Sequence, residues 1–308
     1  MKKVGLSIGA LQSNFGFPLA LDKAKELGCD TVDIGLENRD YRREGDKYSM
    51  TDEEIVAYYS EIGRHAKEIG IEISQTHGRI RGYSLDEEEN KAVLKNARLD
   101  CMVTAALGAP VTVMHICATG RVGPDYPADK MRELGFRMFA DILPFAKEFG
   151  VNVALETFGD SPKYECCDFF GDPNELFAVF NRLKNETPYG DYVSICVDTG
   201  HSNKASRFGH PKPADAIRLF GNNISTLHLN DNDTLTDQHK PPRTGCIDWV
   251  DVMAALKEVG YNGVYNMELS LGCFGKELYL DTAASSNKIM RDILKEAEKA
   301  EQAEQTAQ

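Results

Sequence analysis

Residues with metal-binding and acid–base side chains close several short apolar runs of this 308-residue sequence. Glu156 ends VALE, Asp198 ends ICVD, His228 lies in TLHL and Glu268 follows VYNM. Imidazole nitrogens and carboxylate oxygens are common ligands of Zn, Mn, Fe and Co. Three carboxylates buried together without a cation would repel one another and take up protons. We therefore predict that Glu156, Asp198, His228 and Glu268 surround one divalent metal ion, with coordination positions left open for substrate.

Most of the histidines lie in or directly after the same apolar runs. Only His65 and His210 fall elsewhere, in a predicted helix and a loop. Because histidine titrates near neutral pH, imidazoles at such positions are suited to hydrogen-bonding hydroxyl groups or moving protons. Alternatively, each of these histidines could hydrogen-bond to a metal ligand and orient it. The residues that we expect to bind substrate are His77, His115, His201, Asp237 and His239.

A repeating unit positions these residues. Strand-like runs begin near residues 4, 31, 71, 111, 151, 193, 224 and 263, and helical patterns separate them. Five of the helical patterns end in a glycine suited to a left-handed helix terminus, at Gly28, Gly70, Gly108, Gly150 and Gly260. Strand and helix alternating eight times predict a (β/α)8 barrel, in which the strand ends converge on one face. An open doubly wound sheet is the alternative.

Helix starts fit the same plan. Thr51 with Glu54 predicts a capping box, Asp172 before Pro173 predicts an N-cap, and Asp248 predicts another. No linker divides the chain, so we predict one domain over residues 1–308, with residues from about 294 to 308 forming a polar helical tail.

Composition narrows the function classes. A net charge of −13 disfavours a broad nucleic-acid-binding face. No apolar run reaches the roughly 18 residues of a membrane span, and the N-terminus lacks the long apolar region of a signal peptide. The eight cysteines show no C-x-x-C pair, and the adjacent Cys166 and Cys167 are poorly placed to bridge. We expect reduced, mostly buried thiols and a cytoplasmic location.

The motifs VALET, VDTGH, LHLND and ME at the four predicted strand ends resemble the xylose isomerase-like TIM barrel superfamily. The resemblance spans essentially the whole chain. It implies one divalent ion, often Mn²⁺ with Co, Zn, Fe or Mg as alternatives, held by Glu156, Asp198, His228 and Glu268. It also implies that Glu156 and Glu268 exchange the substrate proton and that His201 contacts substrate.

The stretch from Asp237 to Trp249, DQHKPPRTGCIDW, resembles the loop after the seventh strand of many predicted sugar isomerases. Asp237 and His239 are expected to reach the site. Gly245 and Asp248 are expected to form the turn and the helix cap, and Trp249 to be a core residue. Lys240, Arg243, Arg79 and Arg81 are candidates for binding a substrate phosphate, although such residues more often face solvent.

The function these observations favour is isomerisation or epimerisation of a sugar, sugar phosphate or cyclic polyol, by proton transfer next to a carbonyl. Two departures disfavour a tagatose-epimerase-like ketose 3-epimerase, because Thr234 and Pro162 stand where that group has arginine and glutamate. A dehydratase or another lyase would use the same groups. A metal-loaded barrel that binds a sugar without turnover is a further alternative.

A three-zinc endonuclease acting on abasic DNA is the alternative from another class. The nine ligand positions of that class are all filled by suitable residue types here. The absence of basic runs in the loops and the acidic charge disfavour nucleic acid as a partner. We expect a small-molecule sugar or polyol partner and no membrane. A homo-oligomer is compatible with the sequence, and the segment from Asn38 to Asp52 is a candidate to cover the site or meet a neighbour.

Overall fold

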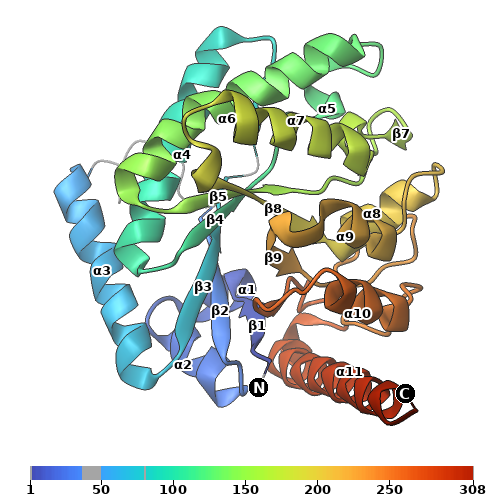
Figure 1. The fold of residues 1–308 in the computed structure, drawn as a ribbon. Helices are drawn as coiled ribbons and strands as arrows, with labels where there is room; N and C mark the ends of the chain where they lie inside the picture. Colours follow the sequence, from blue (N-terminus) through green and yellow to red (C-terminus); the bar gives the residue numbers. More distant parts are fainter. Residues whose placement is uncertain (1, 37–49, 80, 308) are drawn as a thin grey trace.

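A parallel barrel forms the centre of the protein, which we describe from a computed structural model covering residues 2–36, 50–79 and 81–307. Helices surround the strands on the outside (Figure 1). The barrel strands are β1 (Val4–Ser7), β2 (Thr31–Gly35), β3 (Glu72–His77), β4 (Val111–Met114), β5 (Asn152–Glu156), β8 (Val193–Asp198), β9 (Ile224–His228) and β10 (Tyr265–Met267).

All neighbouring barrel strands pair in parallel, in the order β10-β1-β2-β3-β4-β5-β8-β9. A parallel bridge between Leu229 and Met267 joins the two ends of the sheet. The predicted (β/α)8 barrel is therefore confirmed, and the open sheet is excluded. The strand starts agree with the predicted ones to within two residues.

Helices alternate with the strands, and the three predicted helix starts and five predicted helix ends are confirmed to within two residues. The helices are α1 (Gly9–Phe15), α2 (Leu19–Glu26), α3 (Asp52–Ile69), α4 (Glu87–Leu107), α5 (Thr119–Val122), α6 (Ala128–Phe149), α7 (Pro173–Glu186), α8 (Thr199–Ser206), α9 (Pro213–Phe220), α10 (Trp249–Glu258) and α11 (Tyr279–Ala307). Thr51 and Glu54 form the capping box of α3, and Asp172 and Asp248 cap α7 and α10. Gly70, which ends α3, has φ of 70°, a left-handed conformation that glycine adopts without steric cost.

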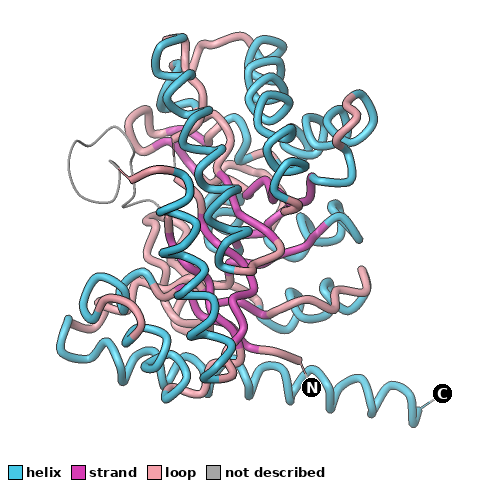
Figure 2. The backbone as a smooth tube through the Cα atoms, turned by 90° about the vertical axis from the view of Figure 1, so that its left-hand side faces the viewer, coloured by secondary structure: helices cyan, strands magenta, loops and turns pink. Residues whose placement is uncertain are grey.

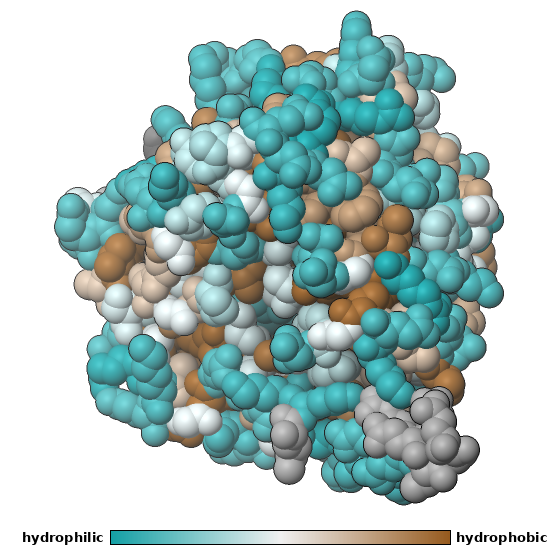
Figure 3. All heavy atoms as spheres, viewed as in Figure 1, coloured by the Kyte–Doolittle hydropathy of each residue, from teal (hydrophilic) through white to brown (hydrophobic). Residues whose placement is uncertain are grey.

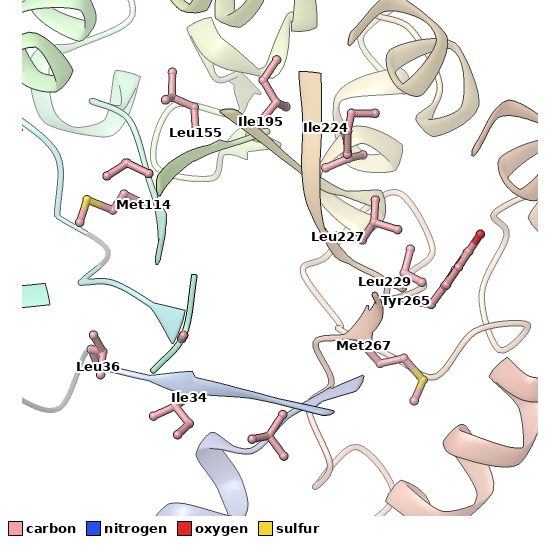
Figure 4. Packing of buried hydrophobic residues seen from close by; sticks show 14 of the residues in the cluster. Ile34, Leu36, Met114, Leu155, Ile195, Ile224, Leu227, Leu229, Tyr265 and Met267 are labelled. Atoms are coloured by element: carbon pink, nitrogen blue, oxygen red, sulfur yellow. The ribbon is translucent and has the colours of Figure 1, made fainter. Parts of the chain in front are cut away.

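Side chains alternate between the two surfaces of the barrel wall. Ile34, Leu155, Ile195, Leu227 and Met267 point outward toward the helices, as Figure 4 shows. Their strand neighbours point inward because successive residues face opposite sides of a strand. Within the barrel, a small apolar layer of Val111, Val113, Ala154 and Cys196 lies below the polar residues at the strand ends. The polar residues at the strand ends therefore point inward at the mouth of the barrel.

The remaining segments lie outside the barrel. A two-stranded antiparallel hairpin of β6 (Asp160–Ser161) and β7 (Cys166–Cys167) follows β5. Helix α11 contains the predicted C-terminal tail and continues past the barrel as one helix (Figure 2). Hydrophilic side chains cover much of the face in Figure 3, with hydrophobic ones between them. None of the described helices has the length and apolar character of a membrane span.

The cysteines agree only in part with prediction. All eight are free, including the adjacent Cys166 and Cys167. Cys29, Cys101, Cys117 and Cys196 are buried, but Cys246 and Cys273 are exposed and the adjacent pair is half-buried. The expectation of mostly buried thiols is therefore wrong for half of them, because these four lie in loops and the hairpin outside the barrel wall.

Candidate metal centre and active site

The C-terminal ends of the strands bring the predicted site residues together. His77, Glu156, Asp198 and His228 are the last residues of β3, β5, β8 and β9, and Glu268 directly follows β10. His115 follows β4, and His201 lies in the first turn of α8. Parallel strands that share one direction place all these residues at the same mouth of the barrel.

Four of these residues form a compact group, which we call the central cluster: His77, Glu156, His228 and Glu268. Each offers a ligand atom, and these atoms all lie within 4.8 Å of one another. The Nδ1 atom of His228 lies 2.8 Å from Glu156 Oε1 and 3.3 Å from Glu268 Oε2. The Nε2 atom of His77 lies 3.4 Å from Glu156 Oε2. Two imidazoles and two carboxylates at this spacing match the donor types that hold divalent ions.

Glu156 carries the clearest sign that a cation belongs here. Its side chain is fully buried, and Oε2 has no hydrogen-bond partner among the described residues. The Nε2 atom of His115 lies 2.7 Å from this oxygen, but not in hydrogen-bonding geometry. A buried carboxylate is costly unless positive charge lies beside it, and either imidazolium or a bound cation can supply that charge. The central cluster therefore fits a divalent ion.

A second group lies beside the first, and we call it the outer cluster: His201, Asp237 and His239. The Asp237 Oδ2 atom lies 3.5 Å from His201 Nε2 and 3.4 Å from His239 Nε2. Asp237 is 42% exposed, whereas Glu156 is fully buried. His239 has φ of 43°, a conformation seldom adopted by residues other than glycine. The outer cluster therefore lies between the central cluster and solvent.

Asp198 lies between the two clusters. One of its ligand atoms lies within 4.8 Å of ligand atoms of His201 and His239. Its Oδ1 atom accepts a hydrogen bond of 2.6 Å from the backbone N–H of His201, which caps α8. Its Oδ2 atom accepts one of 2.8 Å from Asn230 Nδ2. Burial raises the pKa of Asp198, and the carboxylates of Glu156 and Glu268 raise it further, although His201 and His239 oppose this.

Attraction between the imidazoles and the carboxylates sets the protonation state of the central cluster. Burial works against charge on His77, but Glu156 and Glu268 outweigh it and raise its pKa to about 10. Burial would raise the pKa of Glu268, yet the histidines around it hold the value below the usual range. The same competition lowers the pKa of Glu156 well below its usual value. In the metal-free protein the histidines therefore supply the positive charge.

The outer cluster shows the same pattern at its exposed edge. Burial opposes charge on His239, but Asp237 and Glu268 raise its pKa to about 9. Burial would raise the pKa of Asp237, whereas the neighbouring imidazoles of His201 and His239 hold it far below the usual range. A metal ion in either cluster would have to displace protons from imidazoles.

The nine predicted site residues all meet at the barrel mouth, although their grouping differs from the predicted one. The sequence placed Asp198 with Glu156, His228 and Glu268 as metal ligands and His77 among the substrate-binding residues. In the structure His77 lies in the central cluster, and Asp198 groups with His201 and His239. Glu156, His228 and Glu268 belong to both groupings.

Two polar residues that contact His228 from below were not among the predicted site residues. Gln75 Nε2 lies 3.0 Å from His228 Nε2, and Asp33 Oδ2 lies 3.4 Å from the same nitrogen. Ser7 Oγ donates a hydrogen bond of 2.6 Å to Asp33 Oδ2. Both residues occupy inward positions of β2 and β3, so the alternation within TVDIGL and IEISQT could have identified them. They leave His228 Nδ1 directed at the carboxylates.

Asp231 organises the loop that carries Asp237 and His239. Its fully buried carboxylate accepts hydrogen bonds from four donors, namely the backbone N–H groups of Asn232, Arg243 and Ile247 and the indole of Trp249. Trp249 is buried, as predicted, and also holds this carboxylate. Gly245 lies so close to Asp231 that a Cβ atom would come within 2.3 Å of its Oδ1. The loop is therefore tied to the barrel on both sides of the outer cluster.

Two of the four candidate phosphate-binding residues are engaged elsewhere. Arg79 pairs with the buried Asp100 at 2.6 Å, and Arg243 pairs with Glu296 of α11. Arg81 is exposed, and it lines a small cavity together with Arg79. Lys240 pairs with Asp231 through its backbone. Most of the predicted covering segment, namely residues 38–49, lies outside the described residues.

A cavity of about 430 Å³ opens beside the two clusters. Glu268 of the central cluster and His239 of the outer cluster both line it. Neutral hydrogen-bonding side chains supply most of the other described polar lining, namely Ser7, Gln12, Ser13, Asn14, Ser270 and Tyr279. A molecule in this cavity would therefore contact carboxylate, imidazole and hydroxyl groups together.

The sequence matches the xylose isomerase-like TIM barrel family over residues 21–289, so the chain belongs to this family. A D-psicose 3-epimerase from Enterocloster bolteae is 23% identical over 291 residues, covering 89% of this chain and 81% of the relative. The crystal structure of a D-tagatose 3-epimerase-like protein superposes with a TM-score of 0.73 at 20% identity, covering 97% and 99% of the two chains. The IOLI protein, solved with a bound zinc atom, has a TM-score of 0.70 at 16% identity, covering 96% and 98%. Carbohydrate epimerases are thus among the relatives, and the solved structures share the fold.

Proposed function

We propose that this protein is a divalent-metal-dependent isomerase or epimerase that moves a proton at a carbon next to the carbonyl of a sugar or cyclic polyol. The observation that carries the proposal is the central cluster, in which two carboxylates and two imidazoles converge beside a cavity. The epimerase relatives support the same reaction class. A lyase that eliminates water after the same proton removal would need no different groups.

The proposed ligands of the metal ion are Glu156, Asp198, His228 and Glu268. A cation would offset the burial that raises the pKa of Asp198 and the repulsion from Glu156 and Glu268 that raises it further, and it would bind Glu156 Oε2, which accepts no hydrogen bond from the described residues. His77 borders the same space and is the rival for the fourth position. When bound, the ion would polarise the substrate carbonyl and stabilise the negative charge that develops on its oxygen. Mn²⁺ is the ion that we propose, with Co, Zn, Fe or Mg as alternatives.

Glu156 and Glu268 are the proposed proton carriers. A carboxylate that binds a metal through one oxygen can accept a proton on the other, so each should bind the ion through one oxygen only. Glu268 is 22% exposed and lines the cavity, whereas Glu156 lies fully buried behind it. We assign Glu268 to the side of the substrate facing the cavity and Glu156 to the inner side. Two bases on opposite sides of one carbon allow inversion at that carbon.

The remaining site residues are the proposed substrate contacts. His239 lines the cavity, and Asp237 and His201 adjoin it through the outer cluster. His77 and His115 contact Glu156 and can orient a hydroxyl near the ion. Neutral hydroxyl and amide groups line the rest of the described cavity, which suits a polyhydroxylated molecule.

A solvent-exchange experiment tests this function. Mn²⁺-loaded protein would be incubated in D₂O with a panel of ketoses, aldoses and inososes, and NMR would follow loss of the C–H signals next to the carbonyl. We expect metal-dependent exchange or epimer formation with at least one compound, and loss of both in Glu268→Gln. Exchange that continues after chelation and in Glu268→Gln would contradict the proposed mechanism.

Hydrolysis of abasic DNA is the second candidate, and the outer cluster is the observation that favours it. The central cluster and the neighbouring group of Asp198, His201 and His239 can in principle hold more than one ion, as a multi-metal hydrolase requires. A labelled duplex with one abasic site, incubated with zinc-loaded protein, would reveal strand cleavage. We expect none above the level seen with the Glu156→Gln variant.

A further inference from the structure

Lys204 is a buried cation that the proposed reaction does not use. It lies on α8 one turn after His201, so both side chains project from the same face of the helix. Only 4% of the residue is exposed. Lysine is seldom buried to this extent unless its ammonium is paired with acids.

The ammonium of Lys204 joins two carboxylates. Its Nζ atom lies 2.7 Å from Asp160 Oδ1 and 3.6 Å from Asp237 Oδ1. Asp160 lies in the hairpin that follows β5, and its other oxygen pairs with Arg207 at 2.5 Å. The stem of Lys204 passes beside Gly159, where an added Cβ would lie 3.5 Å from the Lys204 Cβ. Lys204 is therefore fixed beside the outer cluster by residues outside it.

The two clusters consequently differ in their neighbours. Among the described residues, every ion pair of Glu156 and Glu268 is with a histidine. Asp237, the sole carboxylate of the outer cluster, also faces the ammonium of Lys204. A divalent ion bound by His201, Asp237 and His239 would stand close to this ammonium and be repelled by it.

We propose that Lys204 is the resident cation of the outer cluster and limits the protein to one divalent ion, held in the central cluster. This inference rests on the proposed function, because it assigns that single ion to the proposed isomerase. The outer cluster is then left with imidazole and carboxylate groups that are free to contact substrate. Lys204 is a positioning residue, since its ammonium acts through Asp237.

Counting bound Mn²⁺ tests this proposal without reference to turnover. Mn²⁺ is the probe because the free cysteines favour softer ions such as zinc. Metal-free full-length protein would be titrated while electron paramagnetic resonance measures the unbound ion. We expect about one Mn²⁺ per chain in the wild type and in Lys204→Arg, which keeps the charge.

Removing the charge should open a second site. In Lys204→Met we expect a second Mn²⁺ per chain, bound at least about tenfold more tightly than any second ion in the wild type. The double variant Lys204→Met/Asp160→Asn removes the buried pair together and should give the same result if the single variant is too unstable to fold. Magnetic coupling between two bound Mn²⁺ ions would place the second ion next to the first.

Several outcomes would overturn the proposal. If the wild-type protein bound two or more Mn²⁺ ions with similar affinities, Lys204 would not exclude a second ion. A folded Lys204→Met/Asp160→Asn variant that still binds one ion would show that the charge is not the reason. Failure of the proposed function would be separate, because it would appear as one bound ion without carbon–hydrogen exchange.

Discussion

The central and outer clusters contain the same types of side chain a few ångströms apart, yet their surroundings differ. In the central cluster, the buried Glu156 and the partly buried Glu268 form ion pairs only with histidines among the described residues, and Glu156 Oε2 accepts no hydrogen bond there. In the outer cluster, the carboxylate of Asp237 is half-exposed and faces the buried ammonium of Lys204. Donor types alone therefore do not define a metal site. In our proposal the ammonium of Lys204, which cannot ligate a cation, is what distinguishes the outer cluster from the central one.

The largest expected effect is that of Glu156→Gln, which removes the fully buried carboxylate of the central cluster. Turnover should fall by about 100- to 10,000-fold, because a proton carrier is lost. Mn²⁺ binding should weaken at the same time, because a charged ligand is lost. Steady-state assays on the substrate found by solvent exchange, together with Mn²⁺ titration, check both effects.

Glu26→Gln is the matched control, because Glu26 is an exposed partner of Lys23 far from the barrel mouth. It should leave turnover and binding unchanged. Unchanged Mn²⁺ affinity in Glu156→Gln would show that the central cluster does not hold the ion.

Metal affinity should rise with pH. In the metal-free protein His77 has a pKa of about 10 and His239 one of about 9, so both carry protons at pH 7. A bound ion favours neutral imidazole, so it must displace protons from histidines that it binds or approaches. For each proton displaced, the dissociation constant should fall about tenfold per pH unit between pH 6 and 8.

Calorimetric titrations with Mn²⁺ in two buffers of different ionisation enthalpy count the released protons. If the ion lies in the central cluster, His239→Gln should change the number of released protons less than His77→Gln does. A pH-independent dissociation constant would contradict the charge balance described for the metal-free protein.

Asp231→Ala should loosen the outer cluster more than the central one. It removes the buried acceptor of four hydrogen bonds, and each donor left buried and unsatisfied costs about 1–3 kcal/mol. We expect the free energy of unfolding to fall by at least about 2 kcal/mol, measured with urea. The Mn²⁺ dissociation constant should change by less than about threefold, roughly 0.7 kcal/mol.

Asp233→Ala is the control for this change, because Asp233 is an exposed turn residue of the same loop. It should destabilise the protein less. A large loss of Mn²⁺ affinity in Asp231→Ala would mean that the two clusters bind the ion together.

The smallest expected effect is that of Arg243→Ala. Arg243 and Glu296 form an exposed pair on α11, and such pairs contribute about 0–1 kcal/mol to the free energy of unfolding. Mn²⁺ binding and turnover should stay at the wild-type level. A substantially higher KM would instead assign Arg243 to substrate binding and restore its predicted role with phosphate.

The positions of the strands, several helix ends and the meeting of nine polar residues could be predicted from the sequence. The first two depend on local patterns, and the third follows from closing eight parallel strands into a barrel. The glycine after α3 and the caps of α7 and α10 are set by a few neighbouring residues. Which residues share a cluster depends on strand register and stagger, so the fourth partner of Glu156, His228 and Glu268 was not readable from spacing. Asp33 lies within the apolar run TVDIGL and was not predicted, although the alternation of that run indicates that its side chain points into the barrel.

Lys204 was missed for a different reason. In the sequence it resembles a surface lysine on a short helix, and nothing nearby predicts its burial. The hairpin that follows β5 brings Asp160 against it, and the loop after β9 brings Asp237. Both contacts of Lys204 join segments that lie more than 30 residues apart in the chain. Two neighbouring contacts span similar separations, 47 residues between Asp160 and Arg207 and 44 between Thr157 and His201.

The position of the bound ion tests the account most directly. Crystals of Mn²⁺-loaded wild-type protein would be measured at the manganese absorption edge, where anomalous peaks locate the metal. We predict one peak, ligated by Glu156, His228 and Glu268, with the fourth ligand deciding between Asp198 and His77. A peak among His201, Asp237 and His239, alone or as a second ion, would contradict the division between the central and outer clusters.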